Sequence, residues 1–326
     1  MNYFKCLSKL VNYFLYASFF LIINSAQAIY PEKPITLVVP FAPGGANDTL
    51  GRIIAQSLST ELKQTVIVEN KPGAGSTIGA EFVANAKADG YTLLLVSAAH
   101  VISSSIYTKL RYDPIRNFTP VAQLTNSAYV LVTGKDSSIK SVQDIIKLAS
   151  KEPNKITYAS SGIGSAPHLA GALLAAKGGV ELVHIPYKGG GPALLDVMRG
   201  DTDIYFASQS GALPFIQSDK LRALGVSTTI RTASLQNVPT IKELGISNFE
   251  LSGWYGIVAP SKTSSAIVQL LNDTIRKILS KEDVQAMLAK HGEQAFISKP
   301  ESFGQFLAYE QKKYQEIIQI AKVEKE

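Results

Sequence analysis

Residues 35–79 read ITLVVPFAPGGANDTLGRIIAQSLSTELKQTVIVENKPGAGSTIG, and this stretch decides the fold. A β-branched run leads into a Gly-rich turn and then into apolar residues at helical spacing, and a second β-branched run and Gly-rich turn follow. The helical stripe consists of Leu50, Ile53, Ile54, Leu58 and Leu62. Strands that alternate with helices predict parallel sheets with helices on both faces, which is an α/β fold.

The same alternation continues through most of the chain. The nine predicted strands are Thr36–Pro40, Thr65–Glu69, Thr92–Ser97, Tyr129–Thr133, Ile156–Ala159, Leu182–Pro186, Ile204–Ala207, Arg222–Ser227 and Trp254–Ala259. The part from Ile267 onward has two long helical patterns instead, which we expect to pack over the sheets. Glu310 interrupts the second pattern, so we expect the middle of that helix to reach solvent.

The first 28 residues have the features of a secretory signal. Lys5 and Lys9 precede an apolar run from Leu10 to Ile23, and Ala26-Gln27-Ala28 fits the A-x-A cleavage pattern. The run is shorter than the ~20 apolar residues that a membrane-spanning helix needs, which favours cleavage over a retained anchor. We therefore expect export to the periplasm and cleavage after Ala28.

Length, charge and cysteine content narrow the function further. The chain has 326 residues, and at ~100–200 residues per domain the part after the signal suggests two domains. The net charge of +6 is spread thinly, and no run of basic residues predicts a nucleic-acid or lipid surface. Cys6 lies within the signal, so the mature chain has no thiol nucleophile, disulfide or Cys-ligated metal. The four histidines lack metal-ligand spacing, and we expect neither a metal nor a cofactor.

Three Gly-rich loops each follow a predicted strand and open a helix: residues 40–48, 70–79 and 160–168. In open α/β sheets ligands bind beyond the carboxyl ends of the strands. A helix N-terminus at that edge offers free N–H groups and a partial positive charge. In the first loop Asn47 or Asp48 suits the helix cap, and we do not expect Asp48 to be a catalytic carboxylate.

The other loops favour binding of a small anion. The second reads G-x-G-x-x-x-G with no acidic residue after the next strand, which fits an anion cradle better than a dinucleotide site. In the third, His168 is either a hydrogen-bonded structural residue or part of the ligand cleft. Lys188, in the fourth segment 187–192, either faces an anion or is exposed. The loops offer N–H and hydroxyl hydrogen-bond donors but no paired acidic and basic side chains, which predicts ligand binding rather than catalysis.

The four loops, in this order and behind a signal, resemble the receptors of tripartite tricarboxylate transporters, the Bug family. The matching phrases are YPEKPITLVVPFAPGGANDTLGRIIA, VENKPGAGSTIGAEFVANAKADGYTLL, ITYASSGIGSAPHLAGALL, HIPYKGGGPALLDVMRGDTDIYF and GWYGIVAP. The resemblance implies two Rossmann-like lobes with a cleft between them, as in type II-like periplasmic binding proteins. Residues 29–126 with 255–326 would form lobe 1, and residues 127–254 would form lobe 2.

The resemblance also implies the function and the site. The ligand would be a small carboxylate (a di- or tricarboxylate, an amino acid or an aromatic acid), passed to the membrane permease subunits by a monomer that is not an enzyme. The candidate ligand-binding residues are Phe41, Ala42, Gly44, Gly45, Gly75, Ser76, Thr77, Ser97, Ser161, Gly162, Gly164, Ser165, His168, Tyr187, Lys188, Gly189 and Ala207. Ser76 stands where the family usually has glycine.

Two other classes of function remain open on the residues alone. An exported α/β hydrolase would need a serine beside a histidine–acid pair, and Ser165 is not in a G-x-S-x-G elbow. A sensor would present its closed form to a signalling protein instead of a permease. The binding hypothesis requires the turns at Phe41, Gly73 and Gly162 to share one cavity.

Overall fold

The computed structural model describes residues 30–326, so the predicted signal, its cleavage site and Cys6 lie outside the described residues. Lys33–Glu326 form one compact unit. Its strands are β1 (Ile35–Val39), β2 (Val66–Asn70), β3 (Thr92–Val96), β4 (Phe118–Gly134), β5 (Thr157–Ser160), β6 (Val183–Pro186), β7 (Ile204–Ser208), β8 (Leu221–Val226), β9 (Ser252–Pro260) and β10 (Gln294–Ala295). All nine predicted strands are present.

Helices fill most of the connections between the strands. They are α2 (Ala46–Leu62), α3 (Thr77–Ala84), α4 (Ala98–Ile106), α5 (Val142–Lys151), α6 (Ala166–Gly178), α7 (Gly190–Arg199), α8 (Gln209–Gln217), α9 (Ser265–Leu279), α10 (Glu282–Lys290) and α11 (Pro300–Ala321). Two short 3₁₀ helices, η1 (Ala74–Ser76) and η2 (Ala233–Leu235), complete the set that residues 30–326 contain.

The sheet consists of two halves that share one long strand. Along it the strands run β2-β1-β3-β9-β4-β7-β5-β6, with β8 and β10 also paired to β4. The strands β1, β2 and β3 are parallel, as are β5, β6 and β7, whereas β4 and β9 run antiparallel to their neighbours. The prediction of parallel sheets is therefore correct for the outer strands and wrong for the two strands at the junction.

The strand β4 connects the two halves without a linker. Its residues Phe118–Ala128 pair with β9, and Tyr129–Thr133 then pair with β7. We call β1–β3, β9, β10 and their helices the first half, and β5–β8 with their helices the second half. Prediction found only the end of β4, because Pro120 and the polar residues that follow it do not alternate like a strand.

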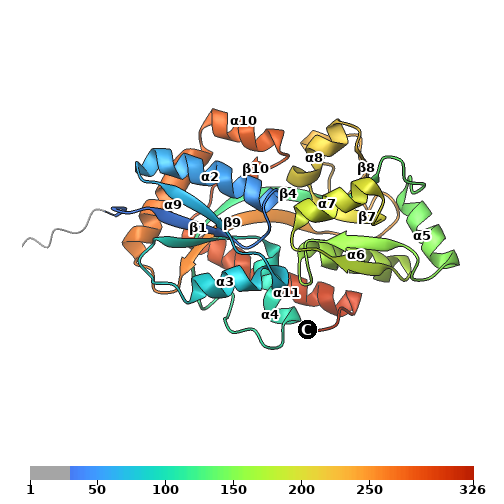
Figure 1. Ribbon diagram of the computed structural model, residues 1–326, viewed down its shortest axis with the longest axis horizontal. Helices are drawn as coiled ribbons and strands as arrows, with labels where there is room; N and C mark the ends of the chain where they lie inside the picture. Colours follow the sequence, from blue (N-terminus) through green and yellow to red (C-terminus); the bar gives the residue numbers. More distant parts are fainter. Residues whose placement is uncertain (1–29) are drawn as a thin grey trace, which may run out of the picture. The chain divides into compact units, whose positions relative to one another are not determined.

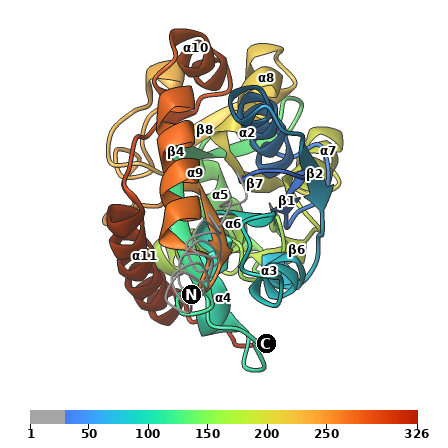
Figure 2. The same cartoon turned by 90° about the vertical axis from the view of Figure 1, so that its left-hand side faces the viewer.

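Helices cover both faces of each half. In the first half α2 and α9 lie on one face, and α3, α4 and α11 lie on the other (Figure 1). Figure 2 shows the same separation of α2 from α3 and α4 from the side. In the second half α7 and α8 pack on one face against Val130, Val132 and Tyr205. The helices α5 and α6 belong to the other apolar cluster, which α11 extends across both halves.

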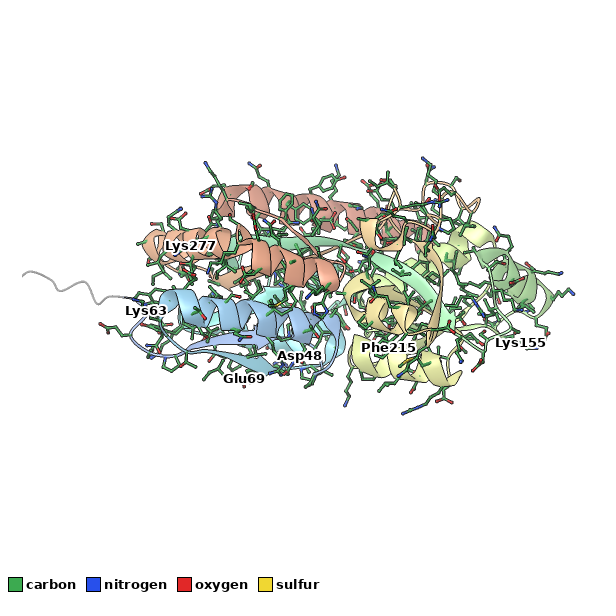
Figure 3. The ribbon with its side chains drawn as sticks, turned by 90° about the horizontal axis from the view of Figure 1, so that it is seen from above. Asp48, Lys63, Glu69, Lys155, Phe215 and Lys277 are labelled. Carbon is green, nitrogen blue, oxygen red and sulfur yellow. The ribbon has the colours of Figure 1, made fainter. Side chains whose placement is uncertain are left out.

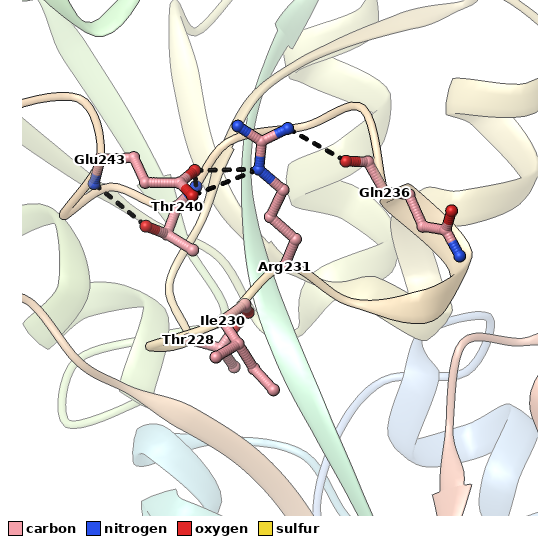
Figure 4. Close-up of polar contacts among 6 residues, drawn as sticks. All are labelled: Thr228, Ile230, Arg231, Gln236, Thr240 and Glu243. Atoms are coloured by element: carbon pink, nitrogen blue, oxygen red, sulfur yellow. Dashed lines mark hydrogen bonds and ion pairs between the residues drawn. The ribbon is translucent and has the colours of Figure 1, made fainter.

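The long segment between β8 and β9 is ordered by surface polar contacts. The Nε of Arg231 donates to Glu243 Oε2 over 3.0 Å, and an Nη donates to the Gln236 carbonyl over 3.2 Å (Figure 4). The backbone N–H of Thr240 donates to the same Glu243 oxygen over 2.8 Å. These bonds stabilise the segment through which the chain passes from β8 in the second half back to β9.

Glu310 corrects the expectation that the middle of α11 reaches solvent. Its side chain is 1 % exposed, and Oε2 accepts a hydrogen bond from the indole N–H of Trp254 in β9 over 2.8 Å. Trp254 is fully buried and packs edge-on against Phe303 and Phe306 of α11. Glu310 is therefore the acceptor for the buried indole N–H of Trp254. The spacing of apolar residues along α11 gives no sign of this partner.

We expect Glu310→Ala to destabilise the protein by about 1–3 kcal/mol, because it leaves the buried indole N–H of Trp254 without an acceptor. Chemical denaturation followed by Trp254 fluorescence measures this change. Glu310→Gln keeps an acceptor oxygen and should lose less, and the exposed Glu316→Ala should stay within about 0.5 kcal/mol of wild type. Equal losses for Glu310→Ala and Glu310→Gln would contradict this role.

Candidate functional site

The N-termini of five helices meet at one cavity between the two halves, which we call the inner cavity. The centre of a water-sized sphere can reach about 30 Å³ of it. Its lining contains the first residue of α2 and α7, Ala46 and Gly190, and the N-cap residues of α4, α6 and α8, Ser97, Ser165 and Ser208. The other lining residues are Phe41, Asn47, Ala99, Tyr129, Ser161, Ala166, Pro167, Tyr205 and Tyr255.

Most of the N–H groups at these helix starts are not occupied by side-chain caps. Within the described part of the chain, no side chain caps α2, α4, α7 or α8. Of the five helices at the inner cavity, only α6 has a side-chain cap within residues 30–326. There, Ser165 Oγ accepts from the N–H of His168 over 3.4 Å. The first turn of a helix carries free N–H groups and about half a positive charge. Five such ends therefore make the inner cavity attractive to an anion.

The side chains of the inner cavity are neutral. The residues lining it, all within the range 30–326, include no Asp, Glu, Lys, Arg or His. The hydroxyls of Ser161 and Tyr205 lie 2.8 Å apart, and burial raises the pKa of Tyr205 to about 12. Tyr205 therefore keeps its proton and remains a donor at neutral pH. The cavity offers backbone dipoles and hydroxyls, and no charged side chain.

A second cavity lies beside the inner one, and we call it the outer cavity. The centre of a water-sized sphere can reach about 280 Å³ of it, and the turns at Phe41, Gly73 and Gly162 all line it. Phe41 and Ser161 line both cavities. The remaining lining residues of the outer cavity are Ala74, Gly75, Ser76, Tyr107, Ile163, Pro186, Tyr187, Lys188 and Glu326. The three turns thus share the outer cavity, whereas neither Gly73 nor Gly162 lines the inner one.

Ser76 has an unusual environment at the edge of the outer cavity. Its backbone is left-handed, with a φ of +91°, and its side chain is 3 % exposed. No hydrogen-bond partner for Ser76 Oγ is found in residues 30–326. Ser76 thus lines the outer cavity with a buried hydroxyl that has no partner in the described residues.

An ion pair between the buried Asp48 and the largely exposed Arg52 fixes the turn at Phe41–Gly45. Asp48 accepts from the Gly44 N–H over 3.1 Å and from Arg52, and Asn70 bridges Asp48 Oδ1 and the Phe41 carbonyl. Although burial acts to raise the pKa of Asp48, these hydrogen bonds outweigh it and lower the pKa below its usual value. Asp48, near the start of α2 (Figure 3), thus binds the turn before the helix instead of capping it, and it is not among the residues that line either cavity.

The candidate ligand-binding residues divide into three groups. Those in the inner cavity are Phe41, Ser97, Ser161 and Ser165. Those in the outer cavity are Phe41, Gly75, Ser76, Ser161, Gly162, Tyr187 and Lys188. Those in neither lining are Ala42, Gly44, Gly45, Thr77, Gly164, His168, Gly189 and Ala207. Tyr129, Tyr205 and Tyr255 also line the inner cavity but were not among the candidates, because aromatic residues in strands usually form core.

His168 lies behind the third loop and stacks on a second histidine. The rings of His168 and His184 are 4.0 Å apart, with an interplanar angle of 14°. The Gly164 N–H donates to His168 Nδ1 over 3.3 Å, and Ser160 Oγ lies 2.6 Å from His184 Nε2. Burial lowers the pKa of His168 to about 4 and that of His184 to about 3, where the neighbouring His168 adds to the effect. Both rings are therefore neutral at pH 7.

The arrangement around Ser165 is not that of a hydrolase. Ser165 Oγ donates to the Gly162 carbonyl over 2.6 Å, and His168 uses Nδ1 to accept from the backbone. Between Tyr30 and Glu326 no group of three or more His, Cys, Asp or Glu residues is placed to hold a metal ion. Among the helices of the same region, none has the length and apolar content to cross a membrane.

The chain is similar to known receptor proteins. Residues 50–323 match the family described as "Tripartite tricarboxylate transporter family receptor". BugT of Bordetella pertussis is 33 % identical over 291 residues, which cover 89 % of this chain and 89 % of BugT. The similarity to these receptors agrees with the expectation that the chain is not an enzyme.

Two solved structures share the fold at similar identity. An R. palustris protein with adipate is 30 % identical, with a TM-score of 0.88 over 91 % of this chain and 100 % of that one. MatC of Rhodopseudomonas palustris with bound malate is 30 % identical, with a TM-score of 0.85 over 89 % of this chain and 100 % of that one. The predicted two-lobed architecture of periplasmic binding proteins is confirmed.

The histidine pair predicts a loss of stability in acid. The folded state keeps both rings neutral, whereas the unfolded chain binds protons near pH 6.5. Their contribution is complete above pH 6.5 and is lost as the pH falls toward 4 for His168 and 3 for His184. Each ring adds a slope of up to about 1.4 kcal/mol per pH unit.

Urea denaturation between pH 8 and 4.5 measures this slope. Replacing His184→Gln removes one of the two titrating rings, so its unfolding free energy should fall less steeply than that of wild type below pH 6.5. Between pH 8 and 7, where neither ring titrates, the two slopes should agree. Identical slopes over the whole range would show that the stacked pair does not hold its rings neutral.

Proposed function

The chain belongs to the family of tripartite tricarboxylate transporter receptors, and we propose that it binds a small carboxylate in the inner cavity. The convergence of five helix N-termini on a cavity without charged side chains carries this proposal. Malate and adipate accompany two related structures, which supports a di- or tricarboxylate as the substrate class. Amino acids and aromatic acids belong to the same chemical class and are included in the test.

The two halves of the sheet correspond, in this proposal, to lobes of residues 29–126 with 255–326 and of residues 127–254. The first would supply the N-termini of α2 and α4, and the second those of α6, α7 and α8. A ligand that contacts both lobes favours the closed state by its differential affinity, and β4 and β9 act as the hinge. The switch of β4 from β9 to β7 after Ala128 supports a hinge at this point.

The binding energy comes from charge-assisted hydrogen bonds. Each contributes ~1.5–3 kcal/mol net, so four or five reach micromolar affinity, ~8 kcal/mol, after the cost of association. Hydroxyls of Ser161, Tyr205 and Tyr255 would orient the part of the ligand away from the helix ends. At the outer cavity the free hydroxyl of Ser76 would reach a longer ligand.

The cellular role follows from the family. As a member of a periplasmic receptor family, the chain acts outside the cytoplasmic membrane, and we propose that its signal is cleaved after Ala28. The receptor would then deliver its ligand as a monomer to the membrane permease subunits of a tripartite tricarboxylate transporter.

Isothermal titration tests the substrate class. We expect citrate, malate, adipate, glutamate, nicotinate or an aromatic acid to bind with micromolar affinity, because the helix ends require a carboxylate. The dimethyl ester of the best ligand retains its shape without its charge and should not bind. Binding of a neutral or cationic compound by a protein that ignores every carboxylate would overturn the proposal.

Ala46→Asp tests the position of the site. A carboxylate at the first residue of α2 should occupy the place of the ligand and weaken carboxylate binding at least ~100-fold, about 2.7 kcal/mol. An acidic residue also suits a helix N-terminus, so the melting temperature should not fall. The neutral isostere Ala46→Asn controls for size and should lose less affinity. Unchanged binding by Ala46→Asp would place the ligand elsewhere.

A further inference from the structure

Tyr107 makes a direct bond from the first half of the sheet to the second. It follows α4, and its hydroxyl donates to the Ile163 carbonyl, in the loop between β5 and α6, over 2.9 Å. The ring also lies against the same loop, because a Cβ at Gly164 would stand 3.3 Å from Tyr107 Cε2. One side chain thus joins the two halves at the outer cavity.

The Tyr107 side chain is held in place as a donor. The backbone of Glu326 bonds to both neighbours of Tyr107, donating to the Ile106 carbonyl over 2.7 Å and accepting from the Thr108 N–H over 2.8 Å. Burial, with a smaller effect of the Glu326 charge, raises the pKa of Tyr107 to about 12. The hydroxyl therefore keeps its proton at physiological pH and acts as a donor.

Gly75 approaches the same carbonyl from the first half. Its φ is +58°, and a Cβ built there would overlap the Ile163 carbonyl oxygen. On the other side of the contact, a Cβ at Gly162 would lie 3.6 Å from Gly75 Cα. The Ile163 carbonyl is thus enclosed by a hydroxyl and by a backbone that only glycine permits. A third direct contact, from the Ala42 N–H to the Lys188 carbonyl over 3.2 Å, lies beside it.

We propose that Tyr107 and Gly75 form a latch that holds the Ile163 carbonyl in the closed state, so that protein–protein contacts add to the closing effect of the anion. The latch rests on the proposed function, in which the two halves close over a carboxylate. Tyr107 is a positioning residue here, because it acts through the opposite loop. A contact made only after closure slows dissociation more than it changes association.

Pulsed EPR distances between the halves test the latch in buffer alone. Spin labels are placed on Lys87→Cys and Glu181→Cys, both exposed, in a Cys6→Ser background so that only the introduced cysteines react. We expect the wild type to populate a short distance, and Tyr107→Phe to shift part of that population to a longer one. The latch would be overturned if the wild type showed only the longer spin-label distance. It would also be overturned if Tyr107→Phe and wild type gave the same distance distribution.

Gly75→Ala separates the latch from general backbone strain. Gly179 has a similar φ of +65°, but a Cβ placed there would meet no atom within 4 Å, so Gly179→Ala carries the strain without the overlap. Gly75→Ala should lose the short distance, and Gly179→Ala should retain it. Equal effects of the two variants would assign the change to strain and overturn the role of Gly75.

Dissociation kinetics give a second, independent measurement. For malate, Tyr107→Phe should dissociate roughly 2- to 10-fold faster, the range of one hydrogen bond, with an association rate within twofold of wild type. A slower association with unchanged dissociation would contradict the latch. If no carboxylate binds the wild type, the proposed function fails, while the distance measurements still decide the latch.

Discussion

Free backbone N–H groups at the starts of α2, α4, α7 and α8 are the constraint on which the rest of the structure depends. Unpaired donors at a buried helix end are costly, and no side chain of the described residues caps these four helices. Their common cavity has no cation to compete for the ligand and no acid to repel it. In the proposed function, an organic anion would satisfy the donors of both halves at once and so couple binding to closure.

The charged and titratable groups near the site support its shape from outside the cavities. Asp48, Arg52 and Asn70 hold the first loop, and the stacked His168 and His184 hold the third. Because these groups are paired or neutral, they fix the loops without adding charge to the inner cavity. The continuous strand β4 joins the two sets of helix ends, and in the proposed function it also acts as the hinge.

Much of this arrangement was predictable from sequence because glycine and proline mark the strand-to-helix turns. The loops at Phe41, Gly73 and Gly162 were located by that signal, and eight of the nine predicted strands both begin and end within two residues of the observed bounds. The first part of β4 was not predicted, since Pro120, Gln123 and Asn126 interrupt the alternation expected of a strand. Side-chain partners were also hidden: Asp48 and Glu310 depend on Asn70 and Trp254, which are distant in sequence.

Amide chemical shifts measure the central claim most directly. In a ¹⁵N-labelled sample titrated with malate, we expect the largest downfield proton shifts at the first-turn amides of α2 and α4 and, at the same ligand concentration, of α7 and α8. Such shifts report new hydrogen bonds from N–H groups of both halves to one carboxylate ligand. Shifts confined to one half, or centred on exposed residues such as Lys188, would contradict the convergence of helix ends as the basis of recognition.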